Sequence, residues 1–78
     1  MKELISLTQI NEGETVIVHE ISAPGGLRHR LLSFGIAKGS EIKVEAQSFR
    51  SSTLKIVVNN TKLALRSIEA DTITVRKK

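Results

Sequence analysis

The chain has 78 residues, a length that predicts a single domain spanning residues 1–78. It contains no cysteine, which excludes disulfides and thiolate metal sites. The formal net charge is +4, but residues 1–24 carry one Lys and four Glu, whereas residues 25–78 carry eleven basic and four acidic side chains. The positive charge of residues 25–78 is compatible with binding to nucleic acid, to an acidic protein face or to anionic lipid, and also with a role in solubility alone.

No apolar segment approaches the ~18 residues of a membrane span. The first three residues are followed only by short apolar runs, a pattern unlike that of a secretory signal. The absence of cysteine agrees with a reducing compartment. We therefore expect a cytoplasmic protein.

The first elements predicted along the chain are a packed N-terminal segment and a strand. Apolar residues within segment 4–10 are expected to pack it onto the domain. Residues 15–21 are mostly β-branched and predict the first strand. Regular alternation places Val16 and Val18 on one face of this strand and Ile21 on the other.

A short helix is expected next. The Pro-Gly-Gly run at residues 24–26 ends the strand and predicts a loop. The spacing i, i+4 and i+7 predicts a helix over residues 27–34. Its buried stripe is expected to consist of Leu27, Leu31 and Phe34. Gly35 is placed to end the helix in the left-handed conformation, with Ile36 making the apolar contact that follows such a cap.

The rest of the chain reads as strands and turns. Residues 41–48 alternate most clearly, with Ile42, Val44 and Ala46 facing inward. Further strands are predicted over residues 53–58, around Leu63 and Leu65, and over residues 72–76. Asn59-Asn60 predicts a two-residue hairpin turn, and residues 67–70 one helical turn. Five short strands, with one helix between the first two, predict an all-β (mainly β) fold: a curled sheet or small barrel.

Residues suited to catalysis or metal binding are few. The two histidines are His19, beside Glu20 on a strand, and His29, whose neighbours Arg28 and Arg30 oppose a divalent cation. Adjacent strand residues point to opposite faces. Ser33 lies one helical turn after His29, which alone is an ordinary surface pair. We expect no enzymatic activity, no catalytic residue, no metal ligand and no cofactor, with both histidines at the surface.

A nucleic-acid surface is the first binding hypothesis. The basic residues that would track phosphates are Arg28, Arg30, Arg50, Lys55 and Arg66. The only aromatic residues are Phe34 and Phe49, however, and single-stranded nucleic acids are held largely by stacking on aromatic side chains. No helix-turn-helix or phosphate-binding glycine loop is present.

A protein-docking surface is the second binding hypothesis. Arg28 and Leu32 are i, i+4 neighbours that turn away from the buried stripe of the helix. An exposed leucine is ordinary by itself, but one beside arginines and a glycine-rich loop suits a docking patch. The hypothesised partner-binding residues are Pro24, Gly25, Gly26, Arg28, Arg30 and Leu32.

One stretch resembles a known family. Residues 30–42, RLLSFGIAKGSEI, join a leucine-bearing helix, Gly-Ile, two residues, Gly and a strand, as in the FeoA family. Gly13 and the segments LALR at residues 63–66 and ADTITV at residues 70–75 match in order, so the resemblance covers nearly the whole chain. Two turns depart from the pattern: Lys38 stands where the family often has Pro, and residues 51–53 replace a loop that often contains Gly or Pro.

The resemblance implies an SH3-like β-barrel and a function. FeoA proteins are bacterial cytoplasmic accessory proteins of ferrous iron uptake, thought to act on FeoB, a membrane transporter with a cytoplasmic GTP-binding domain. The implied role is therefore non-enzymatic docking on a FeoB-type transporter, with membrane contact only through that partner and no nucleic acid bound. The alternatives are a basic nucleic-acid-binding barrel or a standalone relative of the C-terminal domain of metal-dependent repressors. The resemblance adds no metal ligand.

Overall fold

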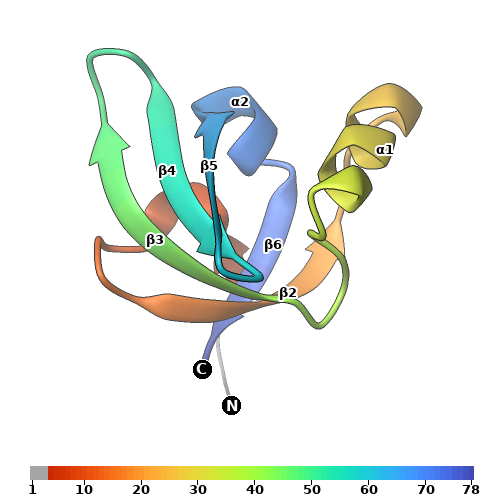
Figure 1. The fold of residues 1–78 in the computed structure, drawn as a ribbon, viewed down its shortest axis with the longest axis horizontal. Helices are drawn as coiled ribbons and strands as arrows, with labels where there is room; N and C mark the ends of the chain where they lie inside the picture. Colours follow the sequence, from red (N-terminus) through yellow and green to blue (C-terminus); the bar gives the residue numbers. More distant parts are fainter. Residues whose placement is uncertain (1–3) are drawn as a thin grey trace.

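A curled antiparallel sheet forms the body of the protein. The computed structural model describes residues 4–78, in which six strands form one sheet in the order β1-β6-β2-β3-β4-β5. The elements in chain order are β1 (Leu4–Ser6), the 3-10 helix η1 (Leu7–Gln9), β2 (Thr15–Ile21), α1 (Gly25–Ser33), β3 (Glu41–Ser48), β4 (Thr53–Val58), β5 (Thr61–Arg66), α2 (Ser67–Ala70) and β6 (Ile73–Lys77). Figure 1 shows the C-terminus at the end of the molecule opposite the β3–β4 turn.

The hydrophobic core fills the concave side of the sheet. The apolar residues with at most 1% of their surface exposed are Leu7, Ile10, Val16, Val18, Leu31, Ile36, Ile42, Val44, Leu54, Ile56, Val58, Leu65, Ala70, Ile73 and Val75. Most follow the period of two that a strand with one buried face requires. The mainly β class is confirmed.

The strand count of five was wrong, because the N-terminal segment adds a sixth strand. β1 pairs with β6 in the register Ile5 to Val75. The segment then turns into η1, whose N-cap Ser6 accepts a hydrogen bond from the Thr8 amide at 3.2 Å. Leu7 is fully buried, as expected, whereas Leu4 at the edge of the sheet is 47% exposed. A three-residue strand is too short to show an alternation in sequence.

A bulge in β2 corrects the predicted face of Ile21. Val18 pairs with Val75 and Glu20 with Thr74, so two residues of β2 oppose one residue of β6. The extra residue reverses the alternation beyond it. Ile21 therefore joins Val16 and Val18 in the core instead of lying on the opposite face.

A second bulge changes the end of β3. Val44 pairs with Ile56 and Ala46 with Lys55, which again reverses the inward positions. Ala46, predicted to face inward, is only half-buried. The Gln47 side chain, predicted to face outward, instead donates from Nε2 to the Thr8 carbonyl at 3.1 Å and ties β3 to η1.

The later turns follow their local sequence. Asn59 and Asn60 have φ of 52° and 61°, so both occupy the left-handed region that a two-residue hairpin turn between β4 and β5 requires. The predicted turn of helix over residues 67–70 is α2. Its first amide, that of Ser67, donates to the Ser52 carbonyl at 2.8 Å, which fixes the β3–β4 turn against α2.

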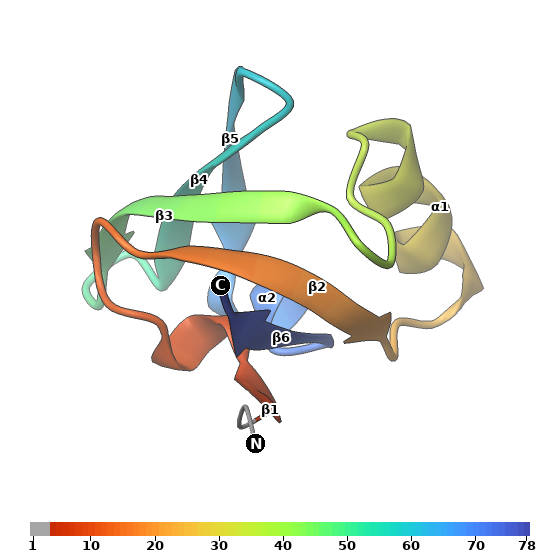
Figure 2. The same ribbon diagram turned by 90° about the horizontal axis from the view of Figure 1, so that it is seen from below.

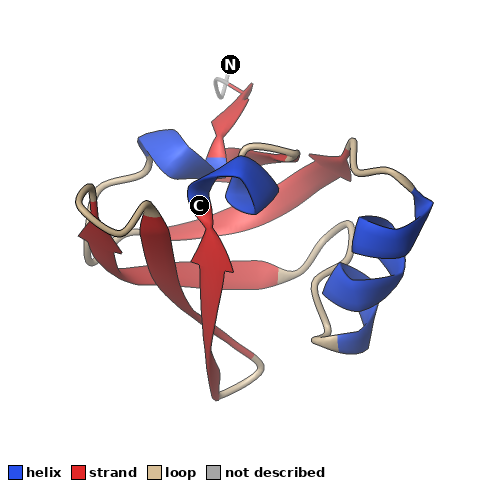
Figure 3. Ribbon diagram, turned by 90° about the horizontal axis from the view of Figure 1, so that it is seen from above, coloured by secondary structure: helices blue, strands red, loops and turns tan. Residues whose placement is uncertain are grey.

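The longest helix stands apart from the other two. Figures 2 and 3 show α1 at one end of the sheet, beside the end of β2, while η1 and α2 lie over the middle of the sheet. This arrangement leaves much of the α1 surface open to a partner. Within residues 4–78, no helix has the length and apolar character needed to cross a membrane.

Candidate docking site

α1 carries most of the residues hypothesised to bind a partner, and it begins earlier than predicted. Its N-cap is Pro24, and the Arg28 amide donates to the Pro24 carbonyl at 2.8 Å. Gly25 and Gly26 therefore form the first helical turn and are not a loop. Amides in the first turn of a helix have no helical partner, so weak helix formers are tolerated there.

The end of α1 has the geometry that the sequence predicts. Gly35 has φ of +88° and donates its amide to Leu32 at 2.9 Å, while the Ile36 amide donates to Leu31 at 3.0 Å. These two bonds form a Schellman motif, which closes the last turn. Ile36 and Leu31 are both fully buried, so the cap anchors the C-terminal end of α1 in the core.

The two faces of α1 differ as expected. Leu31 is fully buried, while Leu27 and Phe34 are half-buried against the core. On the other face, Arg28 is exposed and Leu32 is 47% exposed. α1 is thus held by a narrow apolar stripe, and its outer face presents an apolar side chain next to a cation.

A cleft of about 260 Å³ lies between α1 and the end of β2. Its lining consists of His19, Glu20, Ile21, Arg28, Leu32, Ala37 and Lys38. Arg28 crosses the cleft and donates from Nη1 to the Ile21 carbonyl at 3.3 Å. Of the residues hypothesised for docking, the lining includes Arg28 and Leu32 but not Arg30 or residues 24–26.

The lining of the cleft combines apolar side chains with mainly positive charge. Arg28 and Lys38 carry the cations, and Glu20 accepts a hydrogen bond from the Ser22 hydroxyl at 3.4 Å. The contributions of His19 and Lys38 were not foreseen, because they come from a bulged strand end and from a turn. No local pattern in the sequence brings either residue to the helix.

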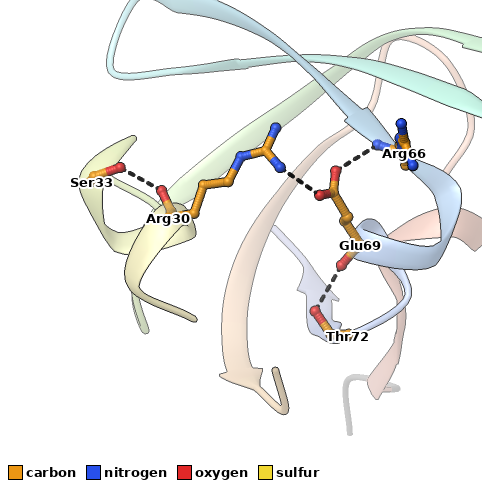
Figure 4. A network of polar contacts seen from close by, with 5 residues as sticks. All are labelled: Arg30, Ser33, Arg66, Glu69 and Thr72. Carbon is orange, nitrogen blue, oxygen red and sulfur yellow. Dashed lines mark hydrogen bonds and ion pairs between the residues drawn. The ribbon is translucent and has the colours of Figure 1, made fainter. Parts of the chain in front are cut away.

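Arg30 lies outside the cleft and connects α1 to α2. Its Nη1 is 2.8 Å from Oε2 of Glu69, and its guanidinium carbon lies 5.8 Å from the centre of the Phe34 ring. Figure 4 shows the arginine reaching from α1 to the carboxylate, while the Ser33 hydroxyl donates to the Arg30 carbonyl. The Arg30 side chain is 55% exposed and still presents part of its surface to solvent.

Glu69 is the structural residue that the sequence did not single out. It is 9% exposed. Its Oε1 accepts the Arg66 amide at 3.0 Å, and its backbone carbonyl accepts the Thr72 hydroxyl at 2.7 Å (Figure 4). Glu at the third position of a helix often caps the residue before the helix. That spacing signals the cap, but the partner Arg30, 39 positions away, has no local signature.

Potential metal ligands do not gather in the part of the chain that the structure describes. Across residues 4–78, no group of three or more His, Cys, Asp or Glu side chains is placed to hold a metal ion. His19 lines the cleft at the end of β2, while His29 is exposed on α1.

Comparison with known proteins gives the family. The model of the FeoA domain matches residues 5–77. The chain belongs to the FeoA domain family. A Campylobacter jejuni protein described as Fe(2+) transport protein A is 32% identical over 71 residues, which are 91% of this chain and 96% of that protein.

Solved structures agree with the FeoA assignment. A crystal structure of an iron uptake regulatory protein (FeoA) has a TM-score of 0.87 and 25% identity and covers 97% of this chain and 99% of that one. A manganese-dependent transcriptional repressor has a TM-score of 0.92 with 23% identity, over 100% of this chain and 44% of the repressor. The repressor likeness concerns the fold alone. The predicted FeoA resemblance and SH3-like fold are confirmed, with six strands in place of five.

Proposed function

We propose that this FeoA domain is a non-enzymatic accessory protein that regulates ferrous iron uptake in the cytoplasm by docking on the GTP-binding region of a FeoB-type membrane transporter. The iron-transport role is supported by the family match and by the names of the C. jejuni relative and the solved FeoA protein. Iron is the cargo of the transporter in this proposal and is not a ligand of this chain.

The cleft between α1 and β2 is the observation that carries the docking proposal. Its lining includes the half-exposed side chain of Leu32 together with two cations, Arg28 and Lys38. Interfaces commonly combine an apolar anchor with arginine, and a few such residues supply most of the binding energy. The cleft is therefore suited to a partner segment that offers an apolar side chain with acidic neighbours.

The chemistry of the cleft favours binding over catalysis. Its lining includes His19 and Glu20 as groups able to transfer protons, but no Ser, Thr or Cys nucleophile. A regulator needs only different affinities for two states of its partner to shift the balance between them. Docking in this cleft would thus bias the GTPase cycle or the conformation of the transporter without a chemical step on this chain.

Calorimetric titration of the chain against the soluble GTP-binding region of the transporter tests the proposal, followed by titration against the full-length transporter in detergent. Saturable binding to the soluble region is expected. Leu32→Asp should remove it, because the variant places a carboxylate in the centre of the contact.

Leu4→Asp is the matched control. Leu4 is also 47% exposed but lies on β1, away from the cleft, so this variant should bind like the unmodified chain. Circular dichroism establishes that both variants fold. Absence of binding to both transporter samples, or equal weakening by the two variants, would overturn the proposal.

A further inference from the structure

Two strongly exposed apolar side chains lie outside the proposed docking cleft. Phe49, at the start of the β3–β4 turn, is 85% exposed, and Ile68, on α2, is 75% exposed. The Ser67 amide donates to the Ser52 carbonyl, so the turn and α2 are joined and hold their positions relative to each other. Figure 1 shows this turn at the end of the molecule opposite the C-terminus.

The surface between the turn and α2 carries hydroxyl groups and cations that are suited to anions. A groove of about 360 Å³ is lined by hydroxyl groups, one arginine and one apolar side chain: Ser51, Ser52, Thr53, Arg66, Ser67 and Ile68. No carboxylate is among these residues. Arg50 adds a second cation on the turn.

The positive charge of this surface is not neutralised internally. Among residues 4–78, the ion pairs join Arg30 to Glu69, Lys62 to Glu45, Lys77 to Glu14 and Lys78 to Glu41, and none includes Arg50 or Arg66. The nearby carboxylate of Glu69 is buried and bound to Arg30 and to the Arg66 amide. The surface therefore offers net positive charge next to apolar side chains.

We propose that this surface, defined by Phe49, Arg50, Arg66 and Ile68, contacts an anionic phospholipid bilayer directly. The arginines attract the headgroups, and the hydroxyl groups of the groove donate hydrogen bonds to a phosphate oxygen. Phe49 and Ile68 enter the boundary between headgroups and acyl chains. A bilayer fits better than a protein pocket because the apolar groups project from a turn and a helix and do not form a concave apolar site. The contact orients the chain at the membrane and is independent of the transporter, so this proposal departs from the expectation that the chain reaches the membrane only through its partner.

Co-sedimentation with lipid vesicles tests the proposal, and no transporter is present. Vesicles of equal parts phosphatidylglycerol and phosphatidylcholine should retain the chain at low salt, whereas vesicles of phosphatidylcholine alone should not. Raising the salt should release it, because screening at ~0.1 M salt already limits attraction between exposed charges to about 10 Å. Failure to bind the anionic vesicles, or equal binding to both kinds, would overturn the proposal.

Variants test which residues make the contact. Phe49→Ser and Ile68→Ser should each lower the partition coefficient by roughly tenfold, the effect of withdrawing one large apolar side chain from the interface. Leu4→Ser removes an exposed apolar side chain elsewhere and should change nothing. The circular dichroism of all three variants should match that of the unmodified chain.

The remaining outcomes are also decisive. Retention of vesicle binding by the double variant Phe49→Ser/Ile68→Ser would contradict the assignment to this surface. A dimer in sedimentation velocity that the same double variant dissociates, without vesicle binding by the unmodified chain, would assign the surface to a second copy instead.

Discussion

The contact between Glu69 and Arg30 predicts an asymmetric response to mutation. The carboxylate serves two elements, because it accepts the Arg66 amide at the start of α2 and the guanidinium of Arg30 on α1. The Glu69 side chain is 12% exposed and that of Arg30 is 55% exposed. We therefore expect α2 to depend on Glu69 much more than either element depends on Arg30.

The magnitudes follow from burial. Removing Arg30 as Arg30→Ala should cost less than about 1 kcal/mol of unfolding free energy, because solvent screens a half-exposed ion pair. Glu69→Ala also removes the cap on the Arg66 amide, and losing a cap costs roughly 0.5–2 kcal/mol, so about 2 kcal/mol is expected in total. Glu69→Gln keeps an oxygen for that amide and should fall between the two variants.

Urea unfolding followed by circular dichroism measures these differences. In thermal unfolding of a domain of this size, a change of 1 kcal/mol in unfolding free energy corresponds to a shift of about 4–8 °C in Tm. If Arg30→Ala lowered the unfolding free energy as much as Glu69→Ala, the reasoning would be refuted. That result would mean that the ion pair, not the cap, stabilises this part of the fold. Arg30→Ala should also leave partner binding within a factor of about two, since losing an exposed contact outside the cleft costs only tenths of a kcal/mol.

Other positions give further predictions. Gly35→Ala and Gly39→Ala should each cost about 1–2 kcal/mol in urea unfolding, because both glycines have φ near +90° and a Cβ is strained there. A Cβ on Gly35 would overlap the Asn59 side-chain amide, but that exposed group can rotate, so a much larger cost for Gly35→Ala would contradict this explanation. Asn60→Gly should raise Tm slightly, because Asn-Gly is the preferred pair for this turn; a lower Tm would argue against the turn type. Arg28→Glu should weaken transporter binding at least tenfold in calorimetry, whereas an unchanged affinity would remove Arg28 from the interface.

Local sequence signals predicted much of the fold. The alternation around Ile42 and Val44 placed β3, and the pair Asn59-Asn60 placed the β4–β5 turn. Gly35 marked the end of α1, because one left-handed residue there satisfies carbonyls that the helix leaves open. In each case the residue and the structure it determines lie within a few positions of each other.

The errors arose where pairing between distant segments decides the outcome. The bulges in β2 and β3 depend on the register against β6 and β4. Ile21 and Gln47 therefore lie on the faces opposite to those that regular alternation predicts, and no local signal in the sequence marks this. The same cause limits prediction of the site. His19 and Lys38 reach the cleft through the fold, and the contact of Arg30 with Glu69 joins residues 39 positions apart in the chain.

The most direct test of docking through the cleft between α1 and β2 is an NMR titration of the isotope-labelled chain with the unlabelled GTP-binding region of the transporter. The amide signals of α1, of the end of β2 and of residues 37–38 should shift, while those of the β3–β4 turn, on the side of the molecule away from α1 (Figure 1), should stay in place. Unchanged signals at a saturating concentration of partner, or shifts confined to β4 and β5, would contradict docking at this cleft.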